Sequence, residues 1–63
     1  MNSDEERAMF EDCGWEYDYI KRRWVSPDGE GWISIDVVVA VSSEGSEGEE
    51  RLRAMVERRC REG

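Results

Sequence analysis

Apolar and polar positions along the chain divide it into segments with different periods. In the first segment, Met9, Phe10 and Cys13 recur at helical spacing and form one narrow apolar stripe. Gly14 follows, and glycine suits the left-handed position just past a helix end. The pattern predicts a helix over about residues 4–13.

The middle of the chain carries two segments with strand-like patterns. Residues 15–25 alternate between apolar and polar side chains, and residues 32–41 are rich in β-branched residues. Between them lies Ser26-Pro27-Asp28-Gly29, with proline and glycine where a type I turn favours them. We therefore expect an antiparallel hairpin with strands over about residues 15–25 and 32–41 and a turn over 26–29.

The register of this hairpin decides which side chains are buried. Setting Trp24 opposite Trp32 places the other aromatic residues and alternate residues of the second strand on one face. That register predicts burial of six side chains in the two strands: Trp15, Tyr17, Tyr19, Ile35, Val37 and Val39. It leaves Trp24 and Trp32 as neighbours on the exposed face, beside Ile20 and Val38.

The last segment has helical spacing again. Leu52, Met55, Val56 and Cys60 form an apolar stripe, and Ser46 with Glu49 resembles a capping box. The pattern predicts a helix over about residues 47–61. The whole chain, residues 1–63, is then a single small α+β domain of order α-β-β-α, with two helices covering one face of the hairpin.

The charged residues are unevenly distributed along the chain. The net charge is −7, from 16 Asp and Glu against nine Lys and Arg. Residues 1–18 hold seven acids and one base, and residues 26–50 hold seven acids and no base. In an α-β-β-α fold we expect many of these acids to converge at the open end of the hairpin. The expected partner-binding acids are Glu11, Asp12, Glu16, Asp18, Glu44, Glu47 and Glu49, continued by Asp28 and Glu30.

Few catalytic arrangements can be built from this chain. It contains no histidine, which excludes Ser-His-Asp and Cys-His sites. We expect Cys13 and Cys60 to be free, buried thiols at opposite ends of the sheet, since the proposed course of the last helix separates them. We expect no catalytic, cofactor or metal site, and no enzyme.

Two interpretations of the surface stay open. A row of carboxylates can imitate a phosphate backbone before a Lys- and Arg-lined groove, although acidic surfaces also aid solubility. Alternatively, Trp24 and Trp32 anchor a protein partner, as in an antitoxin or regulatory subunit, or a second copy of the chain in a homodimer. Ionic strength separates the two, because a charge-driven complex weakens steeply with salt.

In size, charge and expected element order, the whole chain resembles small acidic anti-CRISPR proteins of phages, which share no signature motif. More narrowly, it is similar to inhibitors of type I-C effectors that imitate double-stranded DNA. The resemblance implies a stoichiometric inhibitor whose acids occupy the DNA channel of the effector's large subunit and block recognition of the protospacer-adjacent motif (PAM). The basic last helix, with five Arg between residues 51 and 61, departs from a uniform mimic.

Location and partners follow as expectations. No apolar stretch approaches the 18 to 20 residues, roughly, of a membrane span, and the acidic N-terminus does not resemble a signal peptide. We expect a cytoplasmic monomer in a bacterial host cell. Its partner is then the basic surface of a protein, with no nucleic acid and no membrane bound.

Overall fold

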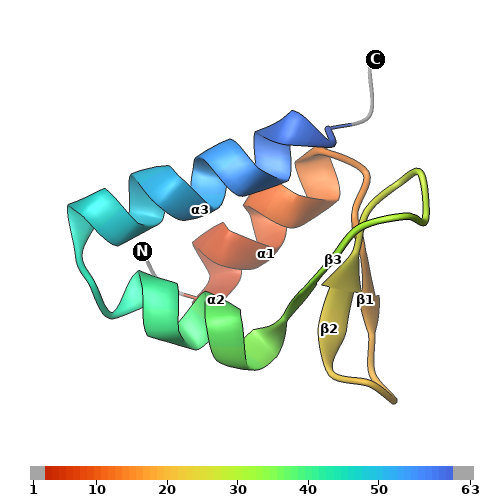
Figure 1. Ribbon diagram of the computed structural model, residues 1–63, viewed down its shortest axis with the longest axis horizontal. Helices are drawn as coiled ribbons and strands as arrows, with labels where there is room; N and C mark the ends of the chain where they lie inside the picture. Colours follow the sequence, from red (N-terminus) through yellow and green to blue (C-terminus); the bar gives the residue numbers. More distant parts are fainter. Residues whose placement is uncertain (1–2, 61–63) are drawn as a thin grey trace.

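The computed structural model describes residues 3–60 and has the expected α+β class, with one strand and one helix more than expected (Figure 1). Three antiparallel strands form a small sheet in the order β1-β2-β3, and three helices pack on one side of it. The elements in chain order are α1 (Ser3–Asp12), β1 (Glu16–Asp18), β2 (Arg23–Val25), β3 (Trp32–Ser34), α2 (Ile35–Ser42) and α3 (Ser46–Arg58).

The first helix and its end are confirmed. Gly14 has φ +85°, the left-handed conformation expected after a helix, and its N–H donates to the Glu11 carbonyl at 3.0 Å. The chain then turns so that the Trp15 N–H donates to the Phe10 carbonyl at 2.9 Å. This turn places Trp15 under the helices and starts the sheet.

The single strand expected over residues 15–25 is wrong, because a turn divides it into β1 and β2. The Asp18 carboxylate accepts hydrogen bonds from the backbone N–H groups of Ile20 (3.0 Å) and Lys21 (3.1 Å). Such side-chain acceptors stabilise turns in competition with strand pairing. Arg22 then adopts φ +54°, which completes the reversal. β2 therefore pairs with β1 as well as with β3.

The turn over residues 26–29 is confirmed, whereas the register beside it is wrong by one residue. The Gly29 N–H donates to the Ser26 carbonyl at 2.9 Å, and Gly29 has φ +76°. Trp24 pairs with Ile33, and Val25, rather than Trp24, pairs with Trp32. A one-residue shift exchanges the faces of a strand, so Trp24 points into the core and Trp32 points outward.

The second long strand is also wrong, since residues 35–42 form α2. The Ser34 hydroxyl caps this helix by accepting a hydrogen bond from the Val37 N–H at 3.3 Å, and Asp36 lies in the first turn. Val38 and Val41, three residues apart, are its buried side chains. Tertiary packing of this stripe therefore outweighs the strand preference of the valines.

The last helix is confirmed, with different ends. α3 begins at Ser46 with Gly45 as its N-cap, and no side-chain hydrogen bond caps it, so the capping box expected at Ser46 is wrong. It ends at Arg58, before the expected limit, and residue 61 lies outside the described residues. Gly48 is buried where α3 passes α2.

The core lies between the three helices and the inner face of the sheet. Phe10 is at its centre, stacked on Trp24 at a ring-centroid distance of 4.4 Å and edge-on to Trp15 at 5.4 Å. The buried apolar side chains are Phe10, Cys13, Trp15, Trp24, Val38, Val41, Leu52 and Val56. The burial expected for Tyr19, Val37 and Val39 is wrong, because these side chains are exposed.

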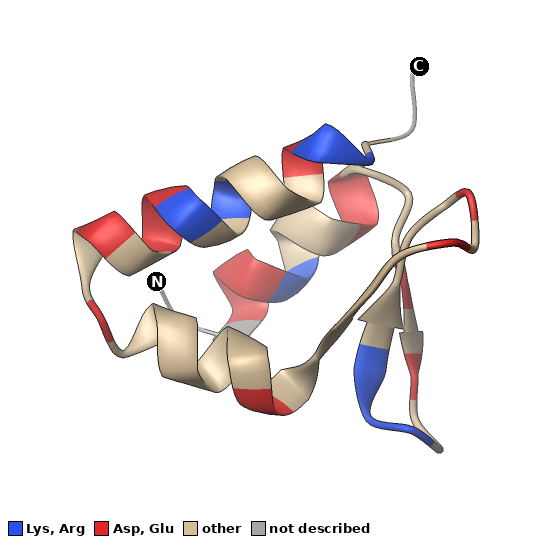
Figure 2. Cartoon of the chain, in the orientation of Figure 1, with Lys and Arg blue, Asp and Glu red and all other residues tan. Residues whose placement is uncertain are grey.

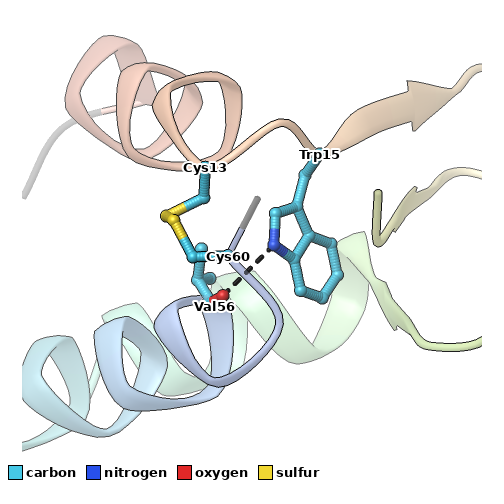
Figure 3. Close-up of a disulfide and its surroundings, with 4 residues drawn as sticks. All are labelled: Cys13, Trp15, Val56 and Cys60. Atoms are coloured by element: carbon cyan, nitrogen blue, oxygen red, sulfur yellow. Dashed lines mark hydrogen bonds between the residues drawn. A yellow bond between two sulfur atoms is a disulfide. The ribbon is translucent and has the colours of Figure 1, made fainter. Parts of the chain in front are cut away.

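Cys13 and Cys60 form a disulfide, so the expectation of two free thiols far apart is wrong (Figure 3). Because α2 is a helix, α3 runs back across the molecule and its end returns to the end of α1 (Figure 1). The two Cα atoms are 4.4 Å apart, within the usual disulfide range. The bond therefore ties together the C-terminal ends of the two helices.

Candidate partner-binding surfaces

The expected acids do not converge at one end of the molecule. Glu44 and Glu47 lie at the start of α3, whereas Asp28 contacts Arg59 just past its end (Figure 2). The 13 residues of α3 separate these positions by about 18 Å at 1.5 Å per residue. The structure therefore divides these acids between two ends, called here the acidic ends: one at the α2–α3 loop, and one at the β2–β3 loop, where Arg58 and Arg59 lie beside Asp28.

Asp28 belongs to a network that shapes the β2–β3 loop. It accepts hydrogen bonds from the Ser26 hydroxyl and the Glu30 N–H (2.9 Å), and Arg59 donates to its other oxygen at 3.0 Å. The Ser26 hydroxyl, the Glu30 N–H and the Arg59 charge lower the pKa of the Asp28 carboxyl. The Asp28 carboxylate therefore links the β2–β3 loop to the end of α3. This role was not predicted from the sequence.

Glu16 and Asp18 lie on the outer face of the sheet, as expected. β2 places Val25 beside Glu16 and Arg23 beside Asp18. Hydrogen bonds from the Lys21 and Ile20 N–H groups, together with the charges of Arg23 and Lys21, lower the pKa of the Asp18 carboxyl. Asp18 is thus a turn-forming residue, and Glu16 is the more exposed of the two.

The remaining acids differ in exposure and partners. Glu44 pairs with Arg51 at 2.9 Å. Glu49 is half-buried and makes an interaction of its own. Five acids of the expected set are exposed: Glu11, Asp12, Glu16, Glu30 and Glu47. These five acids lie at separate places on the surface and are the candidates for contact with a partner.

The tryptophan pair expected on the exposed face does not exist. Trp24 is only 5% exposed and packs on Phe10. Trp32 is 56% exposed, and the Arg23 guanidinium lies 4.6 Å from the centre of its ring. Trp32 therefore remains a candidate contact for a partner, with its ring held by a cation–π interaction with Arg23. Trp24 is no longer a candidate, because it is buried.

A groove runs between α1 and α3 beside the disulfide, with a volume of about 520 Å³. Its floor is apolar, formed by Ala8, Met9 and the two cysteines, and charged side chains stand along its rims. The α1 lining follows the i, i+3, i+4, i+7, i+8 spacing of one helix face: Glu5, Ala8, Met9, Asp12 and Cys13. The α3 lining is Arg53, Glu57 and Cys60.

The groove was not predicted from the sequence, although part of its pattern is visible there. The stripe containing Met9 and Cys13 is visible in the sequence, and Asp12 is among the expected partner-binding acids. The other two bordering acids, Glu5 and Glu57, contribute only to the net charge in that prediction. The groove also needs α3 beside α1. The mistaken strand over residues 32–41 had placed the end of α3 elsewhere.

The described residues contain no cluster of three or more His, Cys, Asp or Glu side chains able to hold a metal ion. Between residues 3 and 60, no helix has the length and apolar character needed to cross a membrane. No protein-family model, curated protein or solved structure matches the chain.

Proposed function

We propose that this protein is a stoichiometric inhibitor that imitates DNA and blocks a basic DNA-binding site of a CRISPR effector, at the surface that reads the PAM. The observation that supports it best is the placement of exposed carboxylates at both ends of α3. A separation of about 18 Å corresponds to the rise of about five base pairs along the axis of duplex DNA, at about 3.4 Å each. A basic channel built for DNA would meet exposed carboxylates at both ends, with Arg58 and Arg59 beside those of the β2–β3 loop.

The electrostatic field of the chain supports the same function. A net charge of −7 on 63 residues steers association with positively charged surfaces and repels nucleic acid. We propose a binder rather than an enzyme, because binding requires only the arrangement of charges. The partner is the large subunit of the effector complex, and one copy of the chain acts as a monomer.

A cytoplasmic location in the host cell is part of this proposal. The reducing cytosol acts against the Cys13–Cys60 bond, since glutathione and thioredoxin keep most thiols reduced there. The proposal therefore requires that the chain inhibits the effector in the redox state that Cys13 and Cys60 have in the cytosol. Measuring inhibition with and without reductant tests this requirement directly.

The central test removes charge from both acidic ends without touching Asp18, Asp28 or Glu44, which have structural partners. The test variant combines Glu16→Gln, Glu30→Gln and Glu47→Gln. The control variant, Asp4→Asn/Asp36→Asn/Glu50→Gln, carries the same net charge of −4. Displacement of PAM-containing DNA from a type I-C effector complex is measured across a salt series.

We expect the test variant to lose DNA displacement and the control to retain most of it. Inhibition by the wild type should also weaken steeply with salt. Equal displacement by both variants at every salt concentration would show that the placement of the charges does not matter. That result would remove the mimicry proposal.

One specific observation supports a second candidate function. Trp32 is largely exposed, and exposed tryptophan is frequent at the centres of protein interfaces. An antitoxin or regulatory subunit bound through Trp32 would lose affinity on Trp32→Ala and depend little on salt. The salt series above therefore separates it from the DNA mimic.

A further inference from the structure

The groove is bordered by two helices, α1 and α3, and has the shape of a site for a third helix. The α1 and α3 linings of the groove lie side by side, and the Cys13–Cys60 bond holds them together at one end (Figures 1 and 3). The α1 lining extends from residue 5 to residue 13, about 12 Å along the helix axis. That length matches about two turns of a helix packed into the groove.

The chemistry of the groove selects the kind of helix. Its floor, Ala8, Met9 and the disulfide, is apolar, with a small residue that permits close approach. Its rims carry three carboxylates, from Glu5, Asp12 and Glu57, against one guanidinium, from Arg53, and Glu5 also makes an interaction within the chain. An apolar floor with a net negative rim is complementary to a helix that has a narrow apolar stripe flanked by cations.

The spacing of the rim acids sharpens this description. Glu5 and Asp12 are seven residues apart on α1, about 10.5 Å along its axis. Two Lys or Arg side chains seven residues apart on a bound helix have the same separation. Apolar side chains between them would then lie over Ala8 and Met9.

We infer that the α1/α3 groove binds a cationic amphipathic helix of the protein partner, with Lys or Arg at positions i and i+7 around a small apolar stripe. The inference rests on the proposed function for the identity of that partner, a protein with a basic DNA-binding surface. It adds a contact of defined shape to the exposed carboxylates of the two acidic ends. The groove would give the complex an orientation that charge alone does not fix.

Binding of a synthetic peptide tests the groove without any knowledge of the target. The probe is a 15-residue helix-forming peptide with Lys at positions 4 and 11 and Leu and Ala on the stripe between them. A peptide of identical composition with the stripe scrambled serves as its control. Backbone amide NMR of the oxidised protein locates the bound peptide, and titration gives its affinity.

Two exposed alanines provide matched protein variants. Ala8 lines the groove, and Ala40 lies on the exposed side of α2. Ala8→Arg fills the floor and adds repulsion, whereas Ala40→Arg adds the same charge elsewhere. We expect a loss of at least tenfold in peptide affinity for Ala8→Arg and less than threefold for Ala40→Arg. The amide shifts should centre on residues 5–13 and 53–60.

Reversing one charge at the rim of the groove gives an independent test. Asp12→Lys should weaken binding of the Lys peptide, and a peptide with Glu at position 4 or 11 should recover part of that loss. Equal binding of the striped and scrambled peptides, or equal affinities of the Ala8→Arg and Ala40→Arg variants, would overturn the groove as a helix site. Either result would show that the protein attracts cationic peptides by net charge alone.

Displacement of DNA from the effector complex links the groove to function. If Ala8→Arg loses both peptide binding and DNA displacement, the effector uses the groove. If Ala8→Arg loses only peptide binding, the effector does not use it, and the inference fails while the proposed function survives. If the wild type displaces no DNA, the proposed function fails, and the assignment of the effector as the source of the helix fails with it. The peptide titration then decides the groove alone.

Discussion

The indole N–H of Trp15 donates a buried hydrogen bond to the carbonyl of Val56 at 3.2 Å (Figure 3). The two residues are 41 positions apart and join the start of the sheet to the last turn of α3. The Val56 carbonyl also accepts a hydrogen bond from the Arg59 N–H at 3.2 Å. The indole bond therefore gives the buried Trp15 N–H its partner, and it joins the sheet to α3 next to the disulfide.

Trp15→Phe should destabilise the domain by about 1–2 kcal/mol, since it removes a buried hydrogen bond and leaves most of the ring contact. For a domain of this size that is a fall of about 4–16 °C in Tm. Trp32→Phe is the matched control, with an expected change within about 0.5 kcal/mol, because Trp32 is exposed. Equal Tm shifts in the two variants would show that the Trp15 hydrogen bond contributes nothing particular.

The disulfide should supply a large share of the stability. It links residues 47 positions apart, and closing a loop of that size stabilises a fold by about 4 kcal/mol in the chain-entropy description. A 63-residue domain has a small core, so we expect a much lower Tm for the Cys13→Ser/Cys60→Ser variant than for the oxidised protein. Thermal unfolding with and without reductant measures this difference. Identical melting of oxidised and reduced wild type would contradict it.

Gly48 should resist substitution by alanine. In an exposed helix, Gly→Ala is favourable by about 1 kcal/mol. Here a Cβ on Gly48 would lie 2.8 Å from the Glu44 Cβ and 3.0 Å from the Val41 carbonyl carbon, so α2 and α3 would have to separate. We expect a net destabilisation of about 1–3 kcal/mol. The control, Glu50→Ala on the exposed side of α3, should change stability by less than about 0.5 kcal/mol.

Acid should weaken the hydrogen bonds that the Asp28 carboxylate makes in the β2–β3 loop. The pKa of Asp28 is lower in the folded protein than its ordinary value, so its stabilising effect is complete above the unfolded pKa, near pH 4, and is lost as pH falls through the folded pKa. Asp28→Asn should therefore reduce the pH dependence of stability below about pH 4. Urea unfolding between pH 2 and pH 6 measures this. Unchanged pH dependence in the variant would show that Asp28 makes no contribution.

Sequence patterns predicted the parts of this fold whose signals are local. α1, its left-handed Gly14 and the turn that ends at Gly29 each depend on a few neighbouring residues, and each was found. The α3 stripe was found for the same reason. The split of the first strand depends on one carboxylate, that of Asp18, which bonds two N–H groups of the turn. Alternating apolar residues on both sides of that turn concealed it.

The largest error has one physical origin. Residues 35–42 contain valines that favour strands, and only the Ser34 cap and the spacing of Val38 and Val41 indicate a helix. Reading this segment as a strand sent α3 to the wrong end of the molecule. That error separated Cys13 from Cys60, gathered the acids at one end and hid the α1/α3 groove. The candidate site could therefore not be predicted until the course of the chain was known.

Neighbouring valines test the helix directly. In α2, Val38 is 1% exposed and Val37 is 43% exposed, whereas the strand interpretation would bury Val37 and expose Val38. Val38→Asp should unfold the domain, because an unpaired carboxylate would enter the core. Val37→Asp should fold with a change in stability of about 1 kcal/mol or less, because its side chain reaches water. Circular dichroism and thermal melting of the two variants measure both outcomes. A folded Val38→Asp variant beside an unfolded Val37→Asp variant would restore the strand and remove the groove that depends on α2.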